Sequence, residues 1–278
     1  MRKWMSVFFS VLFVLVASSV SYASEHQSLP HAVEEGSVLE VFDGASLDLD
    51  GDGTVETIAF EVNTTDNLEE GTYSLRVNGS EATGNGFGLT GQLHAIRLFG
   101  DPNAYLLVSE IGPSDVFTCY VYCYSDGKIS FAGSVETSPD EIYVSGAQFT
   151  GKVRGNVLQT WYRPADFIIA YGFDSDEYQV VEVPRAIYPM GSIVTTKMEI
   201  PLRVSPHKPN DTLAVKKGEK VILAATDDSE WLYVAFTNDH NQEDTYFGGW
   251  LRLDDYSVFV GNKLYDGSDV FDGLLFAG

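Results

Sequence analysis

The chain has 278 residues, enough for one large domain or two small ones with proper hydrophobic cores. Its 40 acidic residues outnumber the 17 basic ones and give a formal net charge of −23 at pH 7. The electrostatic field of such a negative charge repels nucleic acid and anionic lipid and attracts cations and cationic partners. We therefore expect no nucleic-acid binding. Because the acids are spread along the chain, an acidic surface that keeps an exported protein in solution is the simplest explanation for them.

The amino-terminal segment has the layout of a secretory signal peptide. Arg2 and Lys3 precede an apolar run over residues 5–17, and Ser21 and Ala23 are small residues at the two positions that a signal peptidase reads. We expect cleavage after Ala23, which would remove two basic residues and no acid. The alternative is an uncleaved membrane anchor, but a spanning helix needs about 20 apolar residues and serines shorten this stretch.

The chain that follows has the pattern of β-structure. A polar leader over residues 24–36 is followed by short segments rich in β-branched and aromatic residues, with Gly, Asn, Asp and Pro turns between them. The Asp-Gly pair within residues 125–128 is typical of a tight hairpin turn. No window after residue 24 shows sustained helical periodicity, so we predict an all-β fold. The predicted strands of this part cover residues 57–62, 72–77, 92–99, 105–111, 117–124 and 129–135.

Two cysteines and a strand histidine are expected to be structural. Cys119 and Cys123 would share one strand face with their α-carbons roughly 13 Å apart, whereas a disulfide tolerates about 4.4–6.8 Å. We therefore expect free, buried thiols. His94 alternates within a predicted strand and is expected to be a satisfied core or surface residue.

The motif with the clearest chemistry is DLDGDGTVE, residues 48–56, in which acids recur at every second position. Calcium takes six to eight oxygens at about 2.3–2.6 Å, and a tight loop turns alternate side chains toward one point. An EF-hand is excluded, because its twelfth position would be Ala59 and a strand follows the loop. The alternative is an acidic turn without an ion. The expected calcium ligands are the side chains of Asp48, Asp50, Asp52 and Glu56 and the carbonyl of Thr54.

This loop and the strand after it resemble the calcium loop of FG-GAP and VCBS-type repeats, in which DxDGDGxxD leads into a strand of a propeller-like blade. Glu56 stands where the family has a final aspartate. Asp101 follows Asp52 by 49 residues in a similar turn-and-strand segment, a spacing like that of one propeller blade, although chance similarity of two turns is an alternative. The spaced acids have no counterpart there, so a second copy would have lost its metal.

Residues 202–253 resemble a bacterial Src-homology-3-like domain, on the opening LRVSP, the turn KKGEKVIL, the Trp231 strand and the closing GGWL. The resemblance implies a small barrel of five to six strands that binds cell-wall material or protein. An acidic insertion over residues 237–246 departs from the family and could cover its usual groove. Four aromatic residues could form a patch for peptide or glycan, or belong to the barrel core. They are Trp231, Tyr233, Tyr246 and Trp250.

The sequence thus predicts an exported, all-β, non-enzymatic calcium-binding protein of the extracellular space or cell envelope, with cell-wall peptide, glycan or an exported protein as partner. The ion would be structural, because no base or nucleophile motif accompanies the loop. The alternatives are a wall hydrolase with a targeting domain, and an inhibitor or partner of a basic exported protein. The predicted units are a signal peptide (1–23), a leader (24–36), a propeller-like or sandwich calcium-loop domain (37–195), a Src-homology-3-like barrel (196–260) and a tail packed on the fold (261–278).

Overall fold

A computed structural model describes residues 32–64, 70–113, 116–172, 177–208, 210–237 and 246–275. The predicted signal peptide and most of the predicted leader therefore lie outside the described residues. The described chain consists of strands β1 to β22 with two short helical turns, which confirms the all-β prediction. The helical turns are η2 (Pro139–Glu141) and α1 (Gly267–Val270). None of the described helices is long and apolar enough to span a membrane.

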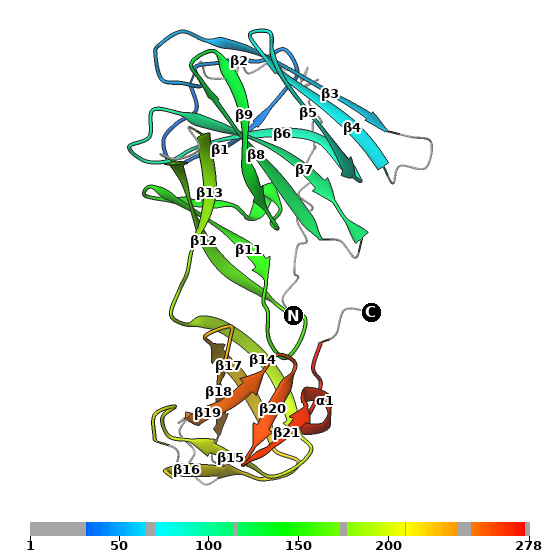
Figure 1. Cartoon of the computed structure of the whole chain (residues 1–278), viewed down its shortest axis with the longest axis vertical. Helices are drawn as coiled ribbons and strands as arrows, with labels where there is room; N and C mark the ends of the chain where they lie inside the picture. Colours follow the sequence, from blue (N-terminus) through cyan, green and yellow to red (C-terminus); the bar gives the residue numbers. More distant parts are fainter. Residues whose placement is uncertain are drawn as a thin grey trace, which may run out of the picture.

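One sheet of the amino-terminal part is four-stranded and antiparallel, with the order β2-β3-β4-β5. Its strands follow one another along the chain as a meander (Figure 1). Strand β4 alternates strictly, with Tyr73, Leu75 and Val77 buried on one face and polar neighbours between them, the pattern of a sheet with one face on a core. The bounds are β2 (Ser46–Leu47), β3 (Glu56–Thr64), β4 (Glu70–Val77) and β5 (Ser80–Phe87).

A second, central sheet of order β1-β6-β7-β8-β9 packs on that buried face. Strand β7 is buried on both sides. Leu106 and Val108 enter the core shared with the first sheet, whereas Tyr105 and Leu107 enter a second core. This explains the unbroken apolar run at the start of this strand. The bounds are β1 (Val38–Val41), β6 (Leu89–Arg97), β7 (Ala104–Ile111), β8 (Phe117–Ser125) and β9 (Lys128–Val135).

The third sheet, β10-β11-β12-β13, covers the other face of the central sheet. Phe149 and Phe167 pair across β11 and β12, with ring centroids 5.3 Å apart, and belong to the second core. The amino-terminal part therefore has three stacked layers of sheet, one more than a two-sheet sandwich. The bounds are β10 (Tyr143–Ser145), β11 (Gln148–Arg154), β12 (Tyr162–Gly172) and β13 (Glu177–Val183).

The carboxyl-terminal module is a curled nine-stranded sheet around a core that also includes Val157 and Leu158 (Figure 1). Seven strands run in the order β16-β15-β19-β18-β17-β14-β22, and the β20-β21 hairpin extends from β19. The sheet thus has more strands than the five to six implied by the resemblance. The bounds are β14 (Tyr188–Thr196), β15 (Ile200–Arg203), β16 (Thr212–Val215), β17 (Lys220–Thr226), β18 (Trp231–Thr237), β19 (Tyr246–Asp254), β20 (Ser257–Val260), β21 (Lys263–Asp266) and β22 (Phe271–Asp272).

Strand β14 crosses the predicted boundary after residue 195. Strand β14 pairs with β17 and β22, so the module already begins at Tyr188. The segment resembled a linker because it holds prolines and a glycine, but the β14–β17 register shifts between Pro189 and Ser192, where a bulge accommodates Pro189 and Gly191. After β20, the chain packs back through β21, α1 and β22, so the tail contains both a helical turn and a strand.

Candidate metal centre and aromatic surface

The acidic loop connects β2 to β3 and is anchored at both ends by buried apolar residues. Leu47, Leu49 and Ile58 have no exposed surface and belong to the core between the first two sheets. Between these anchors, Asp48, Asp50 and Glu56 each place a carboxylate oxygen within 4.8 Å of the other two. Two oxygens that bind the same calcium ion at about 2.3–2.6 Å lie no more than about 5 Å apart, so this spacing fits one coordination sphere.

The loop backbone wraps around its own first aspartate. Oδ1 of Asp48 accepts a hydrogen bond from the N–H of Gly51 at 2.8 Å, and Oδ2 accepts one from the N–H of Gly53 at 3.2 Å. Both glycines have positive φ, +74° and +86°, a conformation that other residues rarely adopt. The glycines therefore allow the tight turn that brings alternate side chains to one side.

Asp52 does not belong to this group of three carboxylates, and the carbonyl of Thr54 stays a predicted ligand. Oδ1 of Asp52 accepts a hydrogen bond from the N–H of Thr54 at 2.6 Å, and both residues are exposed. The structure therefore brings together the side chains of three of the four predicted acids.

Glu56 is the buried member of the group, with 3% of its surface exposed. Its Oε2 accepts a hydrogen bond from the N–H of Leu49 at 2.8 Å, which ties the end of the loop to its start. Burial raises the pKa of Glu56, and the nearby charges of Asp50, Asp48 and Asp52 raise it further, against the effect of the Leu49 N–H. A cation at the three carboxylates would relieve this repulsion.

The turn between β6 and β7 lies against the acidic loop. The N–H of Ala104 donates to the carbonyl of Leu49 at 2.8 Å, so the two segments of the suspected repeat are neighbours in space. Asp101 uses one carboxylate oxygen to accept from the N–H of Asn103 and the other to accept from the hydroxyl of Tyr105. This carboxylate therefore stabilises its own turn.

The predicted aromatic patch lies on the outer face of β18 and β19. Tyr233 and Trp250 are cross-strand partners with ring centroids 5.2 Å apart at 62°, and the guanidinium of Arg203 lies 5.2 Å from the ring centroid of Trp231. All three aromatic residues are half-buried and outside the core, because the alternate residues Leu232 and Val234 fill it.

The patch residue Tyr246 and the acidic insertion are described only in part. The side chain of Tyr246 and residues 238–245 lie outside the described part of the chain. Next to Trp250, a cavity of about 240 Å³ is lined by Arg203, Arg252 and Phe259 among others. The outer face of this module thus combines aromatic rings with two guanidinium groups in an otherwise acidic protein.

A different feature was missed by sequence reasoning. His94, expected to be satisfied, has 8% of its surface exposed, and its Nδ1 has no hydrogen-bond partner among the described residues. It lines a cavity between the central sheet and the η2 turn. An alternating strand pattern shows that such a residue is buried, but it carries no signal that a ring nitrogen lacks a partner.

Comparison with known proteins identifies no relative, because no family model, curated protein or solved structure matches the chain.

Proposed function

We propose that this chain is an exported, non-enzymatic protein whose acidic loop binds a structural calcium ion. The observation that carries the proposal is the approach of the Asp48, Asp50 and Glu56 carboxylates to within 4.8 Å of one another. Hard carboxylate oxygens without nitrogen or sulfur ligands favour calcium or magnesium. Calcium fits better, since it tolerates an irregular oxygen cage, whereas magnesium demands near-octahedral geometry and keeps its waters.

A structural role for the ion is supported by the position of the loop. The Leu49 carbonyl accepts from the Ala104 N–H, so the loop backbone is joined directly to the central sheet. A cation that fixes the loop would therefore also stabilise the contact between the first two sheets. Export rests on the signal-peptide pattern of residues 1–23, and calcium-bearing fluid outside the cell suits such a loop.

Calcium titration of the mature chain tests the proposal. The melting temperature should rise with calcium, and a tenfold excess over the dissociation constant corresponds to about 1.4 kcal/mol of unfolding free energy. Asp50→Asn should abolish the rise, whereas Asp269→Asn, an exposed aspartate in the carboxyl-terminal module, should keep it. A melting temperature that changes with neither calcium nor chelator would contradict the proposal. So would an Asp50→Asn variant whose melting temperature rises with calcium as much as that of the parent.

We also propose that the outer face of the carboxyl-terminal module binds cell-wall peptide or glycan, or an exported protein. The half-exposed pair Tyr233 and Trp250 supports this, because exposed aromatic rings stack on sugars and on peptide side chains. The mature chain should co-sediment with purified peptidoglycan, and Trp250→Ala should weaken this relative to Phe247→Ala, an exposed ring on the same strand. A chain that stays in the supernatant would favour a protein partner instead.

A further inference from the structure

Two adjoining cavities beside the η2 turn, together called the groove, share part of their lining. Their volumes are about 650 and 540 Å³, and Phe117, Ser138 and Asp140 line both. The groove is formed by the starts of β6 and β8, the end of β7 and the η2 turn. It therefore lies at the opposite end of the central strands from the β6–β7 turn that contacts the acidic loop.

His94, which lines this groove, has a buried ring nitrogen without a hydrogen-bond partner among the described residues. The residue is more than nine-tenths buried, it lines the smaller cavity, and its Nδ1 has no partner in the described part of the chain. A buried polar atom without a hydrogen bond is costly, so a ligand that completes the bond gains affinity from it.

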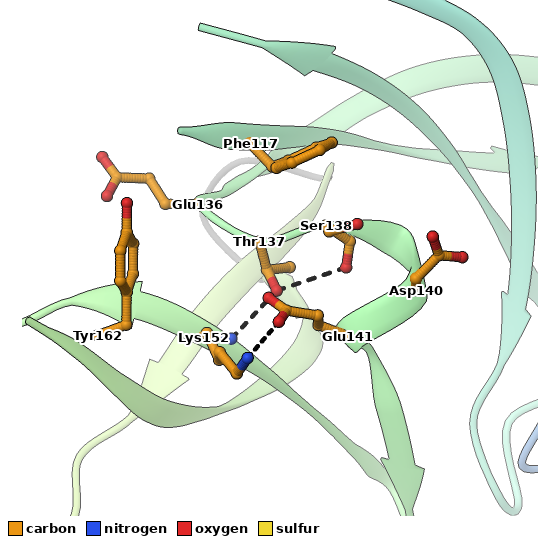
Figure 2. Close-up of a pocket in the computed structure, with 8 residues that line it drawn as sticks. All are labelled: Phe117, Glu136, Thr137, Ser138, Asp140, Glu141, Lys152 and Tyr162. Atoms are coloured by element: carbon orange, nitrogen blue, oxygen red, sulfur yellow. Dashed lines mark hydrogen bonds and ion pairs between the residues drawn. The ribbon is translucent and has the colours of Figure 1, made fainter. Parts of the chain in front are cut away.

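The charges of the groove are predominantly negative. Glu136, Asp140 and Glu141 line the larger cavity together with a single cation, Lys152. Lys152 is already paired with Glu141, as Figure 2 shows, which leaves Glu136 and Asp140 without an ion-pair partner among the described residues. The field therefore repels an anionic ligand and attracts a cation.

A metal ion is not the kind of cation that the side chains of this groove would bind best. Within the described residues, side chains with metal-ligand atoms gather in a group of three or more only in the acidic loop. The groove instead offers separated acceptors with aromatic side chains beside them. Figure 2 shows Tyr162 and Glu136 at one end of the larger cavity and Asp140 at the other, with Phe117 above the space between.

We propose that this groove binds a protonated amine, whose ammonium group donates hydrogen bonds to Asp140 and to Nδ1 of His94 while its hydrocarbon chain packs on Phe117. An ammonium group combines positive charge with three donors, so it satisfies both acceptors at once. A free polyamine and the lysine side chain of a peptide both present this chemistry.

Isothermal titration calorimetry of the mature chain at physiological ionic strength tests the inference, with 1,5-diaminopentane and tetralysine as probes. Binding of the diamine assigns the groove to free amines, and binding of tetralysine alone assigns it to peptide lysines; either outcome supports the proposal. The uncharged 1,5-pentanediol should bind at least tenfold more weakly, since a charge-assisted bond accounts for about that factor. Equal binding of diol and diamine, or no heat with either amine, would overturn it.

Substitutions inside and outside the groove test where the amine binds. Asp140→Asn should weaken amine binding about tenfold, and His94→Phe, which keeps a ring of similar size, about fivefold. Asp269→Asn removes the same charge far from the groove and should change the affinity by less than about twofold, because salt screens distant charges. If Asp269→Asn weakens binding as much as Asp140→Asn, or if Asp50→Asn in the acidic loop abolishes it, the groove is not the site. The melting temperature of each variant confirms that it is folded.

Discussion

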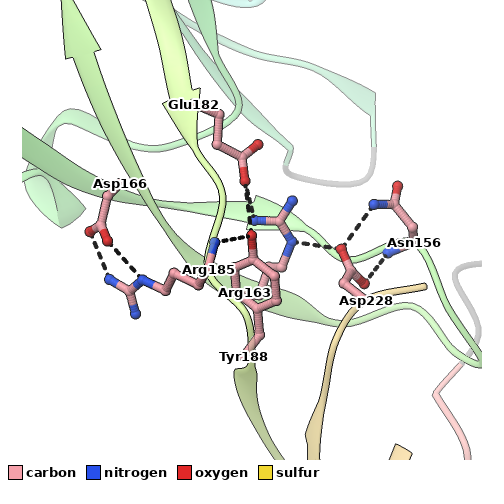
Figure 3. A network of polar contacts seen from close by, with 7 residues as sticks. All are labelled: Asn156, Arg163, Asp166, Glu182, Arg185, Tyr188 and Asp228. Carbon is pink, nitrogen blue, oxygen red and sulfur yellow. Dashed lines mark hydrogen bonds and ion pairs between the residues drawn. The ribbon is translucent and has the colours of Figure 1, made fainter. Parts of the chain in front are cut away.

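Arg163 donates a hydrogen bond from Nε to Oδ2 of Asp228 at 2.7 Å, and this pair joins the third sheet to the carboxyl-terminal module (Figure 3). Both side chains are buried, 8% and 4% exposed. Asp228 also accepts two hydrogen bonds from Asn156, and Arg163 donates a second one to Glu182. The buried charges are therefore balanced and hydrogen-bonded, the condition under which such a pair is tolerated.

Asp228→Asn should destabilise the chain by about 3 kcal/mol, at the lower end of the cost of breaking a buried ion pair, because Glu182 still pairs with Arg163. Asparagine tolerates the positive φ of 59° at this position, so backbone strain does not confuse the result. The matched control is Asp166→Asn, whose partner Arg185 is about one-third exposed, with an expected loss of about 1 kcal/mol. Urea unfolding of both variants measures the difference; equal losses would show that burial of the pair does not matter.

Gly51→Ala should destabilise more than Gly44→Ala. Both glycines have positive φ, +74° and +79°, so each alanine costs about 1–2 kcal/mol of backbone strain. The new Cβ at Gly51 would also lie 2.7 Å from the carbonyl oxygen of Pro102, whereas Gly44 has nothing within 4 Å. We expect an additional loss of at least about 1 kcal/mol at Gly51, since the acidic loop and the β6–β7 turn must separate. Thermal unfolding without calcium gives the comparison, and indistinguishable variants would argue against this close approach.

The free energy of unfolding should decrease as the pH is lowered below about 6.5, because of His94. Burial lowers the pKa of His94 in the folded chain, and the charges of Glu40 and Asp140 oppose this effect only in part. Histidine has a pKa of about 6.5 in an unfolded chain. Below this pH, His94 binds a proton in the unfolded chain but not in the folded chain. The free energy of unfolding therefore drops by at most about 1.4 kcal/mol per pH unit. Above that pH both states are neutral and the effect vanishes.

Urea unfolding of the parent and of His94→Gln between pH 7.5 and 5.5 isolates this effect, since all other groups titrate alike in both chains. The parent should lose more stability than the variant across this range. Parallel curves would mean that His94 titrates normally in the folded chain.

Cys119 and Cys123 should not react with a thiol reagent in the native chain. Both thiols are free and buried, as predicted, and burial raises the pKa of each to about 12. The thiolate, which is the reactive species, is therefore scarce at pH 8. Colorimetric titration should detect no thiol in native protein and two in urea, with a melting temperature unchanged by reductant. Rapid labelling of native protein would contradict the described burial.

The strands could largely be predicted from the sequence, because alternation is a local property. Residues 117–124 were predicted as a strand, and β8 covers Phe117–Ser125. The Asp126-Gly127 turn has positive φ at both residues and joins β8 to β9 as the dipeptide predicts. The stacking order of the three sheets was not predictable. Leu106 and Leu107 are equally apolar, and no feature of the local sequence shows which sheet covers each face of this strand.

The candidate site was predictable only in part, for a similar reason. Spacing identified the acids of residues 48–56, since loop ligands come from one short segment. It could not show that Asp52 binds the N–H of Thr54 instead of joining Asp48 and Asp50. The groove at His94 and Asp140 depends on the η2 turn packing against the central sheet, and no pattern within either segment encodes that contact.

The position of β14 has a consequence for the order of events during folding. Thr196 at its end pairs with Phe271, and Val194 enters the same core as Val270 and Phe271. Under the proposed export, the chain emerges from the export channel with its amino terminus first, so the three stacked sheets can form while this strand still lacks its last neighbour. Until residues 271–272 arrive, Thr195 and Thr196 lack their edge partners, and this end of β14 is open to capture by a chaperone or a second chain.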